Sequence, residues 1–372
     1  MDVSSSMMTL GARQVAMVFG ENTSRQAMGA ALRLLGQSAE VAGMALPGEA
    51  GLEWRELANK LEAFDGFQEA GLAGARLSRS GVPLAEQVRR ASGLGVYRSL
   101  WATEGLGYAH ARGAWTAGPP PRRLLADGGW PERAAIPLHT GAALTFAGWV
   151  LDQGLDQGED RGSADLERWL ALWDGNALSG LRDLAVEALG LMARNLYPQR
   201  MKRLAEDLRV IDPALDEPFW HGVGRGLYFA PTHILPWSGA IGRAFEKAWR
   251  EPPHEPGRLN ATAGLAWALT LVNLRHPEVL ADVLERWGAE IGSTEAFANG
   301  VAAAVLLWDG AAGRDRYLDA FLDYRPEGFR GQAARWHEIV LSPCETALRQ
   351  GSDLKALAGL FRFQAPPGTG GR

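Results

Sequence analysis

The chain has 372 residues, of which 47% are hydrophobic and 22% are charged, so it can bury a sizeable core and extensive disorder is excluded. Its net charge of −5 includes no long Lys/Arg cluster, which argues against a nucleic-acid partner. Cys344 is the one cysteine, which excludes an internal disulfide or a multi-thiolate zinc site and favours a reducing compartment.

At the ends of the chain, residues 1–10 and 364–372 are predicted to be disordered, and residues 11–363 to form one domain. The first residues carry no basic segment leading into an apolar core, so we expect no secretory signal. We expect no apolar run to reach the ~18 residues that a membrane-spanning helix needs, the closest being 261–274. The prediction is therefore a cytoplasmic protein with no integral membrane segment.

A glycine among small and bulky apolar residues recurs along the chain. The anchor glycines are Gly71, Gly105, Gly141, Gly222, Gly264 and Gly300, with a weaker copy at Gly190. Most steps between these glycines are 34–42 residues, which is the length of a helix–turn–helix unit. The step from Gly141 to Gly222 is roughly twice as long, and the weaker copy at Gly190 lies within it. Gly105 to Gly264 and Gly141 to Gly300 both span 159 residues, which predicts two related halves, about 50–151 and 205–310, joined by an acidic connection at 152–165.

The segments between these copies are typical of amphipathic helices. Apolar residues recur at i, i+3 and i+4 over 84–91, 165–173, 238–249 and 277–287, and Pro277 suits the first turn of a helix. The proline-rich stretches 118–121 and 251–257 predict rigid, extended connections. Alternation typical of strands is scarce. The predicted fold is therefore all-α, with repeated helical hairpins that form a curved solenoid or an α/α toroid.

The repeated glycines need a physical reason, because each interior glycine costs a helix about 1 kcal/mol relative to alanine. Either they let neighbouring helices pack closely, or they leave a wall against which a ligand lies. The fourteen tryptophans allow the same two interpretations. They either fill the core beside the small residues or line a tunnel for an extended apolar chain.

Polar residues embedded in the glycine phrases are the candidates for chemistry. Glu104 and Tyr108 are four residues apart, and His221, Arg225 and Tyr228 follow at i, i+4 and i+7, so each set shares a helical face. Carboxylate, imidazole, guanidinium and phenol groups facing a groove suit acid–base catalysis or binding of an anionic group. These five residues form the predicted catalytic set. The predicted ligand-binding residues are Glu69, His110, His139, His233, Trp220 and Trp267. Any one of these histidines, taken alone, is more simply explained as a hydrogen-bonded residue of the core or its rim.

Other candidate motifs are weaker. The sequence contains no HExxH, CxxC, GxSxG or SxxK, and the glycines at 222–226 follow no strand, as a dinucleotide-binding loop would require. The acidic segment 152–165 lacks the rhythm of a calcium loop, so we interpret it as a solvated linker. His337 and Cys344 are seven residues apart, but Pro343 should break the helix between them. We therefore predict no metal site, and no cofactor is indicated.

Three phrases resemble the UnbL-type family of uncharacterised bacterial proteins, a domain of unknown function associated with enediyne polyketide gene clusters. They are Glu104-Gly-Leu-Gly-Tyr108, Trp220-His-Gly-Val-Gly-Arg-Gly-Leu-Tyr228 and Asn260-Ala-Thr-Ala-Gly264, within a similarity that covers residues 55–350. The family's repeated acidic-glycine-tyrosine-glycine-Phe-His phrase is altered here around His221, and the region around Pro343 also differs. The resemblance implies a setting in specialised metabolism near a long unsaturated polyketide-derived chain, and it implies no mechanism.

Two functions follow as expectations. In the first, a protein of specialised-metabolite biosynthesis binds and modifies a hydrophobic polyketide-derived substrate, such as a polyunsaturated chain, with Glu104 as acid or base and Arg225 as anchor. In the alternative, a non-enzymatic helical-repeat scaffold docks partner biosynthetic enzymes. A metal-dependent, diphosphate-handling cyclase using 152–165 ranks third. A binding protein should enclose Glu104 and Arg225, whereas a scaffold should present them on an open concave face.

Overall fold

The computed structural model describes residues 22–116, 122–125, 128–153, 162–230, 239–327 and 332–365, and within these ranges every regular element is helical. This confirms the all-α prediction. The α-helices are α2 (Asn22–Ala45), α3 (Gly48–Arg79), α4 (Leu84–Ala91), α5 (Val96–Thr116), α6 (Ala135–Gln153), α7 (Gly162–Asp174), α8 (Arg182–Leu196), α9 (Met201–Ile211), α10 (Asp216–Tyr228), α11 (Ala240–Arg250), α12 (Glu255–Asn273), α13 (Pro277–Trp287), α14 (Thr294–Ala312), α15 (Arg316–Asp323), α16 (Gln332–Trp336), α17 (Ser342–Gln350) and α18 (Leu354–Ala358).

Proline positions explain where one sequence prediction holds and where two are wrong. Helix α13 begins at Pro277, as predicted, because proline fits a first helical turn. The extended stretch predicted at 251–257 is wrong at its end, since α12 already begins at Glu255 with proline in its first turn. Pro343 does not break the chain either. A π-helical turn, His337–Leu341, leads directly into α17, where Pro343 occupies the first turn and needs no N–H partner.

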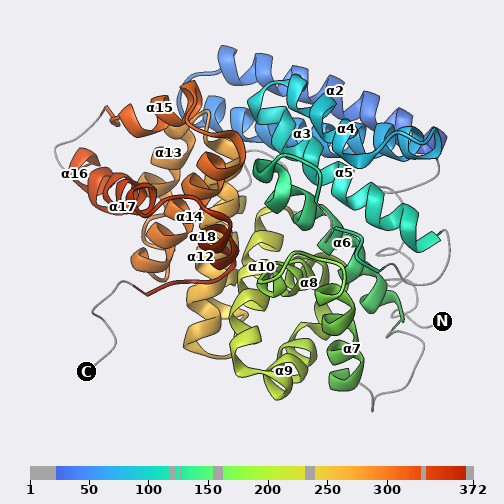
Figure 1. Ribbon diagram of the computed structural model, residues 1–372. Helices are drawn as coiled ribbons and strands as arrows, with labels where there is room; N and C mark the ends of the chain where they lie inside the picture. The colour runs from blue at the N-terminus through green and yellow to red at the C-terminus, as the bar shows by residue number, and fades with distance from the viewer. Residues whose placement is uncertain are drawn as a thin grey trace, which may run out of the picture.

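Seven helices form a central row in which each packs on the next: α3, α5, α6, α8, α10, α12 and α14. The shorter helices α4, α7, α9, α11, α13 and α15 flank this row, and α2 packs along α3. Figure 1 shows α2 and α3 across one end of the molecule and α7 and α9 at the opposite end. Each anchor glycine of the repeated phrase, including the weak copy at Gly190, lies in a different helix of the central row.

These glycines lie where neighbouring helices of the central row touch through their backbones. A Cβ added at Gly107 would lie 2.0 Å from the carbonyl oxygen of Leu138, and one at Gly141 would lie 1.8 Å from that of Glu104. Glycine contacts of the same kind, with distances of 1.8 to 2.1 Å, join α3 to α5, α8 to α10, α10 to α12, and α12 to α14. Only glycine leaves room for such an approach, which brings Cα–H groups against carbonyl oxygens. At these positions the glycines serve close helix packing.

The two ends of the central row meet. The Tyr97 hydroxyl at the start of α5 lies 2.9 Å from the carbonyl oxygen of Val272 in α12 and 3.0 Å from that of Asn59 in α3. The Asn59 side-chain amide donates to the Asn273 side-chain oxygen at 2.9 Å, and the Tyr97 ring packs 6.2 Å from that of Trp308 in α14. The row therefore curves until its first helices pack against its last ones.

Large aromatic side chains fill the core. Trp169, Trp173, Trp220, Trp308 and Trp336 are all buried, as expected for rings packed beside small residues. One described segment, Glu132–Asp152, is long and apolar enough to cross a membrane by length and composition, and 83% of it is buried within the protein. The prediction that 261–274 comes closest to a spanning helix is therefore wrong. A buried core helix passes the same test.

Candidate functional site

Arg225 lies at the centre of a buried group of charges. It projects from α10, where it donates a 2.9 Å hydrogen bond to Glu104 Oε1 on α5 and a 3.1 Å hydrogen bond to Glu187 Oε2 on α8. The three side chains are at most 9% exposed. One guanidinium thus joins three helices whose residues are far apart in the sequence.

Two aromatic side chains complete this group. His221, one turn before Arg225 on α10, has its Nδ1 3.8 Å from Glu187 Oε1, which is too long for a hydrogen bond. The indole of Trp267 on α12 lies 5.1 Å from the Arg225 guanidinium carbon and 6.2 Å from the His221 ring. We call Glu104, Glu187, His221, Arg225 and Trp267 the central cluster.

Close glycine packing brings the cluster together. Gly222 sits against the carbonyl oxygen of Glu187, and Gly264 against that of His221. The side chains that flank these contacts are therefore held at short range on neighbouring helices. His221 and Arg225 share a face of α10 because they are four residues apart. The glycine phrase and the polar residues within it thus form one structural unit.

The two carboxyl groups of the cluster differ in proton affinity. Burial raises the pKa of Glu104, and this effect, helped by the Glu187 charge, outweighs the attraction of Arg225. Burial would also raise the pKa of Glu187, but Arg225 and the nearby His221 ring hold it below its usual value. Glu187 is therefore the carboxylate that stays ionised, and Glu104 is the one that keeps its proton to higher pH.

Several polar atoms of the cluster are buried without a hydrogen-bond partner among the described residues. They are Glu187 Oε1, His221 Nδ1, Arg225 Nε and Trp267 Nε1. The hydroxyls of Thr262 and Thr270 on α12 share this property. Each such atom costs about 1–3 kcal/mol, so a native protein rarely keeps several together unless they have a role.

The structure places the two predicted tyrosines away from the cluster. The Tyr108 ring packs 5.6 Å from Phe67 on α3. The Tyr228 hydroxyl accepts a 2.9 Å hydrogen bond from Asn273, and its ring lies 4.0 Å from the Lys60 ammonium. One turn beyond Arg225, the Tyr228 side chain thus contacts α3 and α12.

Most of the predicted ligand-binding residues have structural partners elsewhere. His139 is buried, with Nδ1 2.6 Å from the Ala135 carbonyl and Nε2 accepting the Leu178 N–H at 3.1 Å. Glu69 is exposed and paired with Arg98, and the buried Trp220 indole donates to Asp216. Burial lowers the pKa of His110, which is only partly enclosed on α5. His233 lies outside the described residues. Of this set, Trp267 alone joins the central cluster.

Sequence reasoning missed Glu187. It lies in the weakest copy of the glycine phrase, three residues before Gly190. Its neighbours in the sequence are apolar, and it is fully buried. A buried charged residue is rarely left without a charged partner, so a glutamate embedded in an apolar segment was the available signal.

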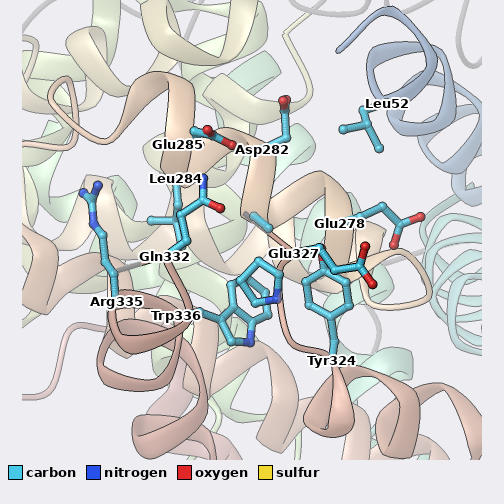
Figure 2. Close-up of a pocket in the computed structure, with 12 residues that line it drawn as sticks. Leu52, Glu278, Asp282, Leu284, Glu285, Tyr324, Glu327, Gln332, Arg335 and Trp336 are labelled. Atoms are coloured by element: carbon cyan, nitrogen blue, oxygen red, sulfur yellow. The ribbon is translucent and has the colours of Figure 1, made fainter. Parts of the chain in front are cut away.

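A separate pocket of about 300 Å³ lies beside α13 and α16 (Figure 2). Its polar wall includes Glu278, Asp282, Glu285 and Glu327, and its aromatic wall is the Tyr324–Trp336 pair, whose ring centroids lie 5.2 Å apart. Arg55 already pairs with Glu278, and Arg286 with Asp282. These arginines balance two of the carboxylates. None of the predicted site residues lines this pocket.

Other candidate chemistry is not assembled in the described ranges. They contain no group of three or more His, Cys, Asp or Glu side chains that could hold a metal ion. Most of the acidic segment, 154–161, lies outside these ranges. Cys344 is fully buried, which raises the pKa of its thiol, whereas His337 is exposed. A buried thiol of this kind is unreactive.

Comparisons of the chain with protein-family models, curated proteins and solved structures return no match.

Proposed function

We propose that the protein binds a hydrophobic ligand within a curved helical array of the solenoid or toroid type and carries out acid–base chemistry on it with the central cluster. The observation that supports this most directly is the pair of carboxyl groups on one guanidinium with pKa values shifted in opposite directions. Opposed shifts of this kind are how active sites assign acid and base roles.

The roles follow from proton affinity. Glu104, whose pKa is raised, donates a proton to the ligand, and His221, held near the ionised Glu187, removes one from another position. The ligand then has the same composition as before, so the reaction is an isomerisation or cyclisation that needs no further reactant. Arg225 and the Trp267 indole N–H supply donors for an anionic or carbonyl group.

In this proposal the setting is specialised metabolism, as the family resemblance implies, and the location is the cytoplasm, as the sequence analysis predicts. In this proposal the substrate is a polyketide-derived, polyunsaturated chain. Such a chain is long and apolar. It would suit the helices that carry the cluster, because their buried faces are rich in alanine, leucine and tryptophan. Burial of its apolar surface would supply most of the binding free energy, and the polar cluster would fix its orientation.

A second candidate function, docking of partner enzymes, has its own observation. Helix α2 exposes Leu34, Val41 and Met44 at 65%, 61% and 68%. These positions recur at i, i+7 and i+10, so they share one face of the helix. Exposed apolar patches on a surface helix are typical of protein-binding sites.

The experiment that tests the first proposal is native mass spectrometry of the protein purified from its producing organism. We expect a co-purifying hydrophobic small molecule with the unchanged protein and much less of it with Glu104→Gln and Glu187→Gln. Glu69→Gln is the matched control, because Glu69 is an exposed glutamate outside the cluster. Equal ligand occupancy in all three variants would overturn the proposal. A protein that carries a second polypeptide in place of a small molecule would support docking.

A further inference from the structure

The described chain ends in a short segment that lies against the central row. It comprises α18 and the 3-10 turn Gly359–Phe361, and we call residues 354–364 the C-terminal strap. Helix α18 contacts α6 and α14, and the 3-10 turn contacts α8, α10 and α14. In Figure 1 it is the dark-red segment beside α14. The strap therefore touches helices that are not neighbours in the row.

The strap contacts the central cluster through one aromatic pair. Phe361 is fully buried, and its ring centroid lies 6.4 Å from that of Trp267. Trp267 in turn packs on Arg225 and His221. A ligand that approached the cluster from this side would meet Phe361 first, then Trp267, then the charged groups.

Polar contacts hold the end of the strap in place. Arg362 forms an ion pair of 2.6 Å with Asp183 at the start of α8, and one of 3.3 Å with Glu217 at the start of α10. The Phe363 N–H donates to the Asn260 side chain on α12 at 2.7 Å. The Arg362 side chain is 26% exposed, so these ion pairs are open to solvent and to disruption.

The strap follows Gly351, the glycine that ends α17, and we take this residue as its hinge. Gly351 has a φ of +88°, a conformation that favours glycine, and a Cβ there would have nothing within 4 Å. The hinge and the exposed ion pairs are the features of an element that can lift as a unit. The strap differs in this from the central row, whose helices are fixed by backbone contacts.

We propose that the C-terminal strap gates the central cluster: it lifts to admit a hydrophobic ligand, whose apolar part takes the place of Leu360 and Phe361. This inference rests on the proposed function and adds the route by which its substrate enters. It also assigns the apolar part of the binding site to the surface that the strap now covers, between α8, α10 and α14.

The test measures access to His221 in the full-length protein by diethylpyrocarbonate labelling and mass spectrometry. Arg362→Glu reverses the charge that faces Asp183 and Glu217, and we expect it to raise the labelling rate of His221 roughly tenfold, equivalent to about 1.4 kcal/mol. The double variant Asp183→Arg/Arg362→Glu should restore slow labelling. Lys355→Glu makes the same charge change at an exposed position of the strap and should have no effect.

His139 is the internal control, because it is equally buried but its ring packs between Trp130 and Trp173. Its labelling should stay slow in every variant. The proposal is overturned if hydrogen exchange of the strap does not rise in Arg362→Glu. It is also overturned if His139 becomes labelled together with His221, which would mean general loosening. Labelling needs no ligand, so this result is independent of the mass spectrometry that decides the proposed function.

Discussion

His139 and His221 are both buried, yet their ring nitrogens have different partners. Both nitrogens of His139 are satisfied, by the Ala135 carbonyl and the Leu178 N–H, and this arrangement fixes a neutral ring with its proton on Nδ1. Nδ1 of His221 has no hydrogen-bond partner among the described residues and lies beside an ionised glutamate. His139 is therefore structural, and the proposed function assigns proton transfer to His221, whose Nδ1 has no such partner.

His139 gives a pH prediction. Burial lowers its pKa from 6.5 to about 4, against a weaker opposing effect of the Ala135 carbonyl. Below pH 6.5 the unfolded chain binds a proton that the folded protein refuses, so the free energy of unfolding falls as the pH drops. The loss should reach about 3 kcal/mol near pH 4 and then level off.

Urea denaturation between pH 7.5 and pH 4 measures this slope. His139→Gln, which keeps an acceptor for the Leu178 N–H, should flatten it. The prediction is wrong if the two proteins lose stability in parallel over this range. NMR titration of the His139 ring gives an independent reading, with an expected pKa near 4.

At the scale of helices, glycine contacts determine how closely neighbouring helices of the central row can approach one another. Gly107 on α5 faces the carbonyl of Leu138 on α6, and Leu138 lies three residues before Gly141. In return, Gly141 faces the carbonyl of Glu104, which lies three residues before Gly107. Gly190 and Gly222 repeat this reciprocal pattern, as do Gly224 and Gly264. Each of these three pairs of helices (α5–α6, α8–α10 and α10–α12) is thus joined at one crossing point by two glycines.

Two substitutions on α5 test this packing. Gly107→Ala should lower the free energy of unfolding by about 3 kcal/mol, because the new Cβ would force α5 and α6 apart. Gly113→Ala is the matched control on the same helix, since nothing lies within 4 Å of its Cβ position, and it should raise stability by about 0.5–1 kcal/mol. Chemical denaturation of both variants decides the matter, and similar losses would contradict it.

The sequence predicts most of the helices and the positions of their glycines, but it predicts less of the central cluster. Repeated glycines and apolar spacing are local patterns, so they predict the helices and place an anchor glycine in each helix of the central row. Glu104, His221 and Arg225 were predicted together because they flank those glycines. Tyr108 and Tyr228 lie away from the cluster because of the helices that pack around them. Glu187 joins the cluster for the same kind of reason, since α8 packs on α10. Those contacts join residues as far apart in the sequence as Lys60 and Tyr228, which periodicity does not encode.

At the scale of the whole molecule, contacts between the two ends of the central row join its first helices to its last ones. Tyr97 and Asn59 from the N-terminal part meet Val272 and Asn273 from the C-terminal part. Arg275 strengthens this junction by pairing with Glu62 and lying 3.7 Å over the Tyr97 ring. Open repeat arrays unfold in parts because each repeat contacts only its neighbours. This junction predicts one cooperative transition instead.

Tyr97→Phe tests that cooperativity. It keeps the ring but leaves the buried carbonyls of Asn59 and Val272 without the hydroxyl, at a cost of about 1–3 kcal/mol. Because the junction links both ends, hydrogen exchange should accelerate by roughly tenfold in α3 and in α12 together. Tyr317→Phe is the control, since that hydroxyl meets only the exposed Arg316, and it should change neither helix. Faster exchange confined to α5 would mean that the two ends of the row unfold independently.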